Sequence, residues 1–140
     1  MLIGDDTRDT LNGAPCAIAI APAGYAEQPV AMREIGVSYD GSAESEHALE
    51  VARTLAAETG AGLSAFEAVS YPRTAFLGGP TPVEEAIAQL VGQARERIAA
   101  LGGVEAHAVY GHPVVELALY SASLDLRIVG SRVELSDRGA

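Results

Sequence analysis

The stretch EIGVSYDGSAESEHALEVARTLAAETG, residues 34–60, predicts one strand followed directly by one helix. Its opening apolar run ends at Asp40, Gly41 and Ser42, which is typical of a strand that enters a turn. Ser42 is a favourable helix N-cap, and Gly60 supplies the left-handed residue that ends a helix. Between these caps, apolar residues recur at spacings of three and four and form one stripe for burial: Ala48, Leu49, Ala52, Leu55 and Ala56.

The same alternation of strand and helix continues toward the C-terminus. Strands are predicted over residues 63–70, 104–110 and 125–130, and helices over residues 82–101 and from Pro113 onward. Regular alternation of this kind is typical of a parallel sheet with helices on both faces. Right-handed crossovers restrict its topology. We therefore predict an open, doubly wound α/β fold of the Rossmann-like type.

The N-terminal part of the chain has a different pattern. A short helix is predicted from about Thr7 to Asn12, and the continuous apolar run Cys16–Ala21 predicts a strand buried on both faces. The stretch that follows, residues 23–33, comes after Pro22, contains Gly24 and Pro29 and has no periodicity, which indicates a linker.

Composition narrows the class of protein. The 140 residues, 49% of them hydrophobic, suit one compact domain. The net charge of −10, without any basic run, makes nucleic acid a poor partner. A single cysteine and the absence of signal-peptide features favour a reducing, cytoplasmic compartment. No apolar stretch approaches the roughly 18 residues that a membrane span needs, so we expect no membrane partner.

Candidate ligand-binding residues lie where the predicted strands end. Asp40, Val69 and Gly130 are at or near the carboxyl ends of three strands, which is where doubly wound sheets bind ligands. Asp40 could accept hydrogen bonds from a ribose or an amine, although an ordinary turn with a capping acid is the alternative. The small residues Gly130 and Ser131 would admit a ligand to the backbone.

Catalytic and metal-binding motifs are not recognisable. The three histidines, His47, His107 and His112, have no cysteine or acid at metal-ligand spacing, so structural roles are predicted for them. No serine stands in a nucleophile elbow, and no acid and base have recognisable partner spacing. We therefore predict a protein that is not an enzyme.

Two longer segments resemble the universal stress protein family. Residues 34–70 are similar to the family's first strand, helix and second strand, and VYGHPVVELALYSASLDLRIVGSR, residues 109–132, is similar to its third helix and fourth strand. LIGDDTRDTLNGAPCAIAIAP, residues 2–22, looks like the end of such a domain. The resemblance divides the chain into the tail of a preceding domain (1–22), a linker (23–33) and a domain that lacks its own last helix and strand (34–140).

The resemblance also implies a fold and a ligand. The family's sheet has strand order 3-2-1-4-5, here with the fifth strand supplied by the N-terminal tail, in the adenine nucleotide alpha hydrolase-like arrangement. Nucleotide-binding members hold ATP, with Mg²⁺, between the first and fourth strands. The tail would complete the sheet of its own chain, or that of a partner in a domain-swapped homodimer.

The resemblance implies that seven residues of this sequence bind the ligand: Asp40, Gly41, Ser42, Val69, Gly130, Ser131 and Arg132. Asp40 matches the acid that meets the adenosine portion, and Val69 matches the residue whose backbone faces the adenine. Gly130 matches the first glycine of the phosphate loop, and Arg132 would meet phosphate oxygens with paired donors. These assignments imply a non-enzymatic, ATP-binding stress-response module.

Two departures from the family pattern favour an alternative function. Val133 replaces the second glycine of the phosphate loop. The family pattern later has a glycine followed by serine or threonine, and its nearest match here is Gly4-Asp5, in which the acid replaces the hydroxyl residue. A side chain at Val133 would crowd phosphates, and an acid at position 5 would repel them. The alternative is an assembly or dimerisation module that keeps the fold and binds no nucleotide.

Overall fold

A computed structural model describes residues 16–70 and 83–131 of the chain. Residues 31–131 form one compact unit. Residues 16–30 belong to a second unit and are described by themselves. The predicted helix from Thr7 to Asn12 lies outside the described residues, as do Asp5, Arg132 and Val133.

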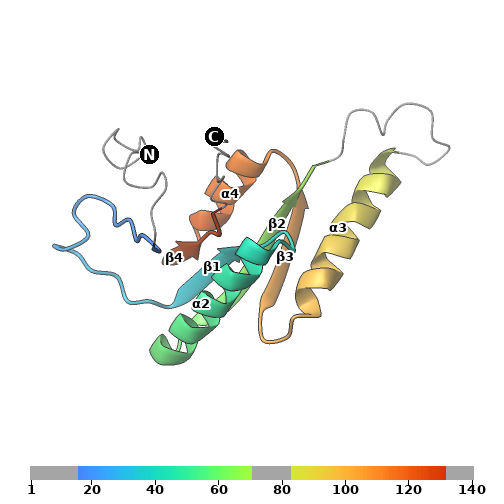
Figure 1. Cartoon of the computed structure of the whole chain (residues 1–140). Coiled ribbons are helices and arrows are strands. Elements are labelled where there is room, and N and C mark those ends of the chain that lie inside the picture. The colour runs from blue at the N-terminus through green and yellow to red at the C-terminus, as the bar shows by residue number, and fades with distance from the viewer. Residues whose placement is uncertain (1–15, 71–82, 132–140) are drawn as a thin grey trace, which may run out of the picture. The chain divides into compact units, whose positions relative to one another are not determined.

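The compact unit is a four-stranded parallel sheet with three helices (Figure 1). The strands are β1 (Glu34–Ser38), β2 (Gly62–Val69), β3 (Glu105–Tyr110) and β4 (Leu126–Ile128). The helices are α2 (Ala43–Thr59), α3 (Val83–Ala99) and α4 (Pro113–Ser121). The sheet order is β3-β2-β1-β4, and every pair is parallel. The predicted α/β fold and the order 3-2-1-4 are confirmed; a fifth strand is not among the described elements.

The ends of α2 follow the predicted capping chemistry. Ser42 has extended backbone, and its Oγ accepts a hydrogen bond from the N–H of Ser45 at 3.2 Å. Gly60 ends the helix with φ of 73°, and its N–H donates to the Ala56 carbonyl. Both predicted caps are therefore confirmed, so local sequence alone determines where this helix begins and ends.

The hydrophobic core lies between the sheet and helices α2 and α3. Ile35 and Val37 of β1 are completely buried, and Ile98 of α3 is buried beside them. On α2 the predicted stripe contributes Ala48, Leu49 and Ala52 as buried residues. Its remaining members pack against the core while partly exposed. Side chains of a strand alternate between faces, so these residues all lie on one side of the sheet.

Helix α4 covers the opposite face of the sheet (Figure 1), and its Tyr120 packs on β2. Its ring stacks on Phe66 with centroids 4.6 Å apart, and its hydroxyl makes a hydrogen bond with the Ser64 hydroxyl. The phenol also occupies the space beside Gly36, where a Cβ would lie 2.5 Å from Tyr120 Oη. The absence of a side chain at Gly36 is therefore what leaves room for the Tyr120 ring and the Leu124 side chain against β1.

Asp125 connects the start of β4 to the start of β1. Its Oδ2 accepts hydrogen bonds from the backbone N–H groups of Arg33 and Glu34, each at 2.9 Å. The Asp125 N–H donates in turn to the Glu34 carbonyl at 2.9 Å. The two accepted hydrogen bonds lower the pKa of the Asp125 carboxyl, because they favour its ionised form. These three contacts support a strand that is only three residues long.

The predicted strand over Cys16–Ala21 is wrong. These residues have no strand structure and are exposed, with Ile18 at 37% and Ile20 at 47% of full exposure. Cys16 is exposed as well, not buried as the apolar run suggested. An apolar run forms a strand only when a neighbouring strand pairs with its backbone, and no described strand pairs with this segment.

We predict that Gly36→Ala lowers the free energy of unfolding by about 1–3 kcal/mol, because the new methyl group overlaps the packed Tyr120 ring. Gly92→Ala is the matched control: it lies within α3, where a Cβ meets nothing within 4 Å. That change should raise stability by about 0.5–1 kcal/mol, since alanine favours helix. Urea unfolding followed by circular dichroism measures both, and equal midpoints for the two variants would contradict the packing described here.

We predict that Asp125→Asn lowers the urea midpoint at neutral pH and that the difference from the parent shrinks on acidification. A carboxyl whose folded pKa is lowered stabilises the fold above its ordinary pKa and loses that contribution as pH falls through the folded value. The change should occur below about pH 4. Glu96→Gln, at an exposed position of α3, is the control. A gap between Asp125→Asn and the parent that stays constant with pH would refute the assigned role.

Candidate functional site

The strand order reverses beside β1, and this reversal defines the candidate site. The chain passes from β1 to β2 and β3 on one side, and β4 then returns to pair with the other side of β1. In doubly wound sheets, the loops that leave such a switch point diverge and leave a crevice for ligands at the carboxyl ends of the strands. The β1–α2 turn and the residues after β4 are these loops.

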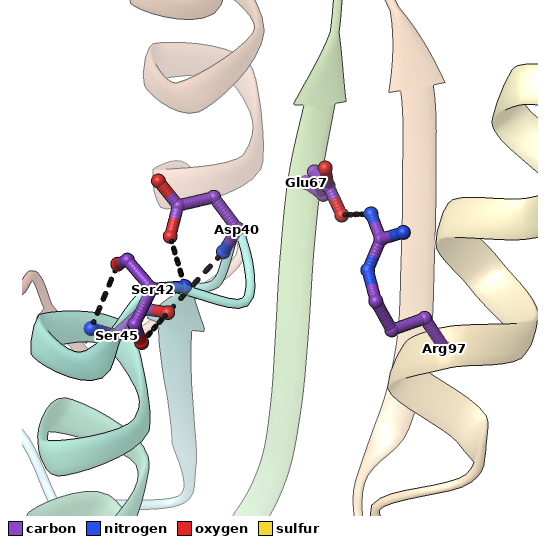
Figure 2. A network of polar contacts seen from close by, with 5 residues as sticks. All are labelled: Asp40, Ser42, Ser45, Glu67 and Arg97. Carbon is purple, nitrogen blue, oxygen red and sulfur yellow. Dashed lines mark hydrogen bonds and ion pairs between the residues drawn. The ribbon is translucent and has the colours of Figure 1, made fainter.

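The β1–α2 turn is held by a closed set of hydrogen bonds (Figure 2). Asp40 Oδ1 accepts from the Ser42 N–H at 2.9 Å, across Gly41 with φ of +82°. The Ser45 hydroxyl donates to the Ser42 carbonyl at 2.9 Å and accepts from the Asp40 N–H at 3.4 Å. The three predicted residues of this turn therefore lie together in one defined conformation.

Gly130 brings the end of β4 against the first turn of α2. A Cβ at Gly130 would lie 2.5 Å from the carbonyl oxygen of Glu44 and 2.6 Å from its carbonyl carbon. No side chain fits that space, because the obstructing atoms are backbone. Gly130 and the exposed Ser131 are thus placed beside the α2 N-terminus, whereas Arg132 lies outside the described residues. The structure brings together the two segments that the sequence assigned to ligand binding.

Val69 directs its backbone away from the switch point. Its carbonyl accepts a hydrogen bond from the Gly111 N–H at 3.2 Å, on the β3 side. Phe66, three residues earlier, accepts from the Tyr39 N–H at 2.9 Å, on the β1 side. Successive residues of a strand present their backbone groups to alternate neighbours. The backbone of Ala68 therefore faces the β1 side, beyond the last β1–β2 pair.

An ion pair that sequence reasoning missed lies next to this turn (Figure 2). Arg97 of α3 reaches β2, where its Nη2 is 2.6 Å from Glu67 Oε2. The Glu67 side chain is only 15% exposed, whereas that of Arg97 is 48% exposed. The Arg97 Nε also lies 4.0 Å from the position that a Cβ of Gly41 would take. An acid inside an apolar strand was the available signal, but sequence alone did not identify its partner.

Acidic side chains dominate the electrostatics around Tyr39. Burial raises the pKa of the Tyr39 phenol, and the carboxylate of Glu46 raises it further. Asp40 and Glu67 act in the same direction, while Arg97 opposes them. The phenol therefore stays protonated at neutral pH, in surroundings where three carboxylates outnumber one guanidinium.

Two of the histidines contact acidic side chains of their own elements. His47 is paired with Glu50 on α2 at 3.8 Å, and His107 with Glu105 on β3 at 3.2 Å. Within residues 16–70 and 83–131, no three side chains of metal-ligating type gather into a cluster. In the same ranges, no helix has both the length and the apolar character needed to cross a membrane.

Together, the parallel sheet and the two loops at its switch point define a doubly wound α/β domain. The sequence model described as "Universal stress protein family" matches residues 32–134. The chain belongs to the universal stress protein family.

Several solved structures are similar to this chain. Protein Rv1636 from Mycobacterium tuberculosis H37Rv is 24% identical over 74% of either chain, with a TM-score of 0.46. UspA from Lactobacillus plantarum is 18% identical over 79% of this chain and 85% of its own, with a TM-score of 0.49. A universal stress protein in complex with cAMP is 27% identical over 71% and 77%, with a TM-score of 0.44. The comparison with curated proteins gave no match.

We predict that Gly130→Ala separates the end of β4 from α2, since the Glu44 backbone cannot move aside without distorting the helix. The expected result is a loss of about 1–3 kcal/mol in the free energy of unfolding. Val129→Ala, which changes an exposed neighbouring side chain, is the control and should change stability by less than about 0.5 kcal/mol. Thermal unfolding measures the stability of both variants. A Gly130→Ala variant as stable as the parent would contradict the close contact between Gly130 and the Glu44 backbone.

Proposed function

We propose that this chain is a non-enzymatic universal stress protein module that binds an adenine nucleotide at the carboxyl ends of β1, β2 and β4. The observation that carries this proposal is the contact between Gly130 and the Glu44 backbone, because it joins the β4 loop to the Asp40 turn. Membership of the family supports the same ligand class. We expect the module to act in the cytoplasm.

Each part of the nucleotide has a proposed partner. Asp40 would accept hydrogen bonds from the ribose hydroxyls, in a turn whose conformation Ser42 and Ser45 already fix. The N–H and C=O of Ala68 would meet the edge of the adenine ring, which offers both an acceptor and a donor. Gly130 and Ser131 would approach the first phosphate through their backbone. Arg132 and ATP-bound Mg²⁺ remain sequence-based parts of the proposal.

The non-enzymatic part of the proposal rests on the chemistry of the described residues. The Ser42 and Ser45 hydroxyls are engaged in capping hydrogen bonds. The hydrogen bonds of these hydroxyls to Asp40, Ser42 and Ser45 involve no general base of the kind that activates a nucleophile. The site can therefore hold and orient a ligand, and we expect bound ATP to remain intact.

The alternative, an assembly module, draws support from α4. Three large apolar side chains on this helix are unusually exposed: Val114 at 70%, Val115 at 55% and Leu119 at 66%. Grouped exposed apolar residues are typical of surfaces that contact another protein. Under this alternative the chain is a homodimer whose sheet no longer binds nucleotide.

We predict that the purified chain binds AMP and that Asp40→Asn weakens binding roughly tenfold, because the amide cannot accept two charge-strengthened hydrogen bonds. Asp125→Asn is the matched control, since it makes the same chemical change at the amino ends of β1 and β4, whereas the site lies at the carboxyl ends. Isothermal titration calorimetry measures affinity, and chromatography of the recovered ligand tests turnover. A parent that forms dimers by light scattering but binds no adenine ligand would support the assembly module instead.

A further inference from the structure

We propose that the guanidinium of Arg97 stacks on the adenine ring of the bound ligand and that Glu67 positions it for this contact. The inference rests on the proposed function and adds a base-binding residue from α3 to the same site. Three features carry it: the place of the guanidinium, its attachment to Glu67, and the face of a bound base that it would meet.

The Arg97 guanidinium lies near both the β1–α2 turn and the carboxyl-terminal part of β2 (Figure 2). Its Nε is 4.0 Å from the position that a Cβ of Gly41 would take, and its Nη2 is 2.6 Å from Glu67 Oε2. Arg97 also opposes the rise that burial causes in the pKa of the Tyr39 phenol. The proposed function assigns the ribose and the base to these same two segments.

Glu67 holds the guanidinium and leaves much of it accessible. The Glu67 side chain is only 15% exposed, which restricts the positions that its carboxylate can take. The Arg97 side chain is 48% exposed, and Glu67 engages it through Nη2. A guanidinium is planar and stacks on aromatic rings. Because an arginine that is already held in place loses less freedom when a ligand binds, the ion pair prepares it for that contact.

The Ala68 backbone determines how a base would lie in the proposed complex. The N–H and C=O groups of a strand point along the sheet, whereas its side chains stand roughly perpendicular to it. A base that is hydrogen-bonded to Ala68 would therefore lie near the plane of the sheet, with its ring faces toward the helices. Glu67 extends toward α3, where it meets Arg97. The guanidinium is thus on the side of a ring face, not of the ring edge.

The same position separates Arg97 from the proposed phosphate partners. Gly130 and Ser131 follow β4, which pairs with β1 on the side away from β2. Two strand spacings amount to about 10 Å. We therefore expect Arg97 to contribute to binding of the base and not of the phosphate.

Calorimetric titration of the full chain with adenosine and with AMP tests the base contact. Arg97→Lys keeps the positive charge and removes the planar guanidinium. It should weaken the binding of both ligands by the same factor, roughly three- to tenfold, because they share the base. Arg95→Lys makes the same change at another exposed position of α3 and should alter neither affinity.

Glu67→Gln tests the positioning role. It should weaken adenosine binding in the parent chain, because the guanidinium is no longer held by a carboxylate. In the Arg97→Lys background it should cause no further loss, since the stacking group is already absent. If the ion pair serves the fold alone, both single variants lower the urea midpoint and their losses of affinity add, which would overturn the inference.

The outcomes also separate this inference from the proposed function. An Arg97→Lys variant that binds AMP more weakly but adenosine unchanged would assign Arg97 to the phosphate and overturn the base contact. Unchanged affinity for both ligands would overturn it as well. Either result leaves adenine binding intact, whereas a parent chain that binds neither ligand overturns the proposed function too.

Discussion

The pairing of β1 with strands on both of its sides is the constraint on which the rest of the structure depends. Residues Ile35–Val37 are in register with β2 on one side and with β4 on the other. On the α2 side this strand needs apolar side chains, and on the α4 side it has no room for a side chain at Gly36. These two requirements explain the alternation of Ile35, Gly36 and Val37. The same central position makes the end of β1 the switch point where the loops after β1 and β4 diverge.

Features that depend on neighbouring residues in the sequence were predictable. Ser42 and Gly60 bound α2 because a hydroxyl N-cap and a left-handed glycine act within one helical turn. The alternation of strand and helix predicted a parallel sheet, and the family resemblance implied the order β3-β2-β1-β4 that the structure has. The Asp40 turn and Gly130 could also be located, since both directly follow predicted strands.

Features that depend on register or on distant partners were not predictable. Backbone groups of successive β2 residues point alternately toward β1 and toward β3. Phe66 points toward β1, so Ala68 does as well and Val69 does not. The sequence of one strand does not reveal which set of residues points which way. The ion pair of Glu67 with Arg97 joins residues 30 positions apart. The exposed run that begins at Cys16 has strand-like composition, but pairing decides whether such a run becomes a strand.

Stability and ligand binding compete for the same groups at the α2 N-terminus. A hydroxyl cap, an Asp40 acceptor and acids in the first turn all stabilise a helix, because they satisfy its N–H groups and oppose its dipole. Phosphate would use the same N–H groups and the same field. At this helix the Ser42 and Ser45 N–H groups are engaged within the protein, so under the proposed function a phosphate would have to use other donors.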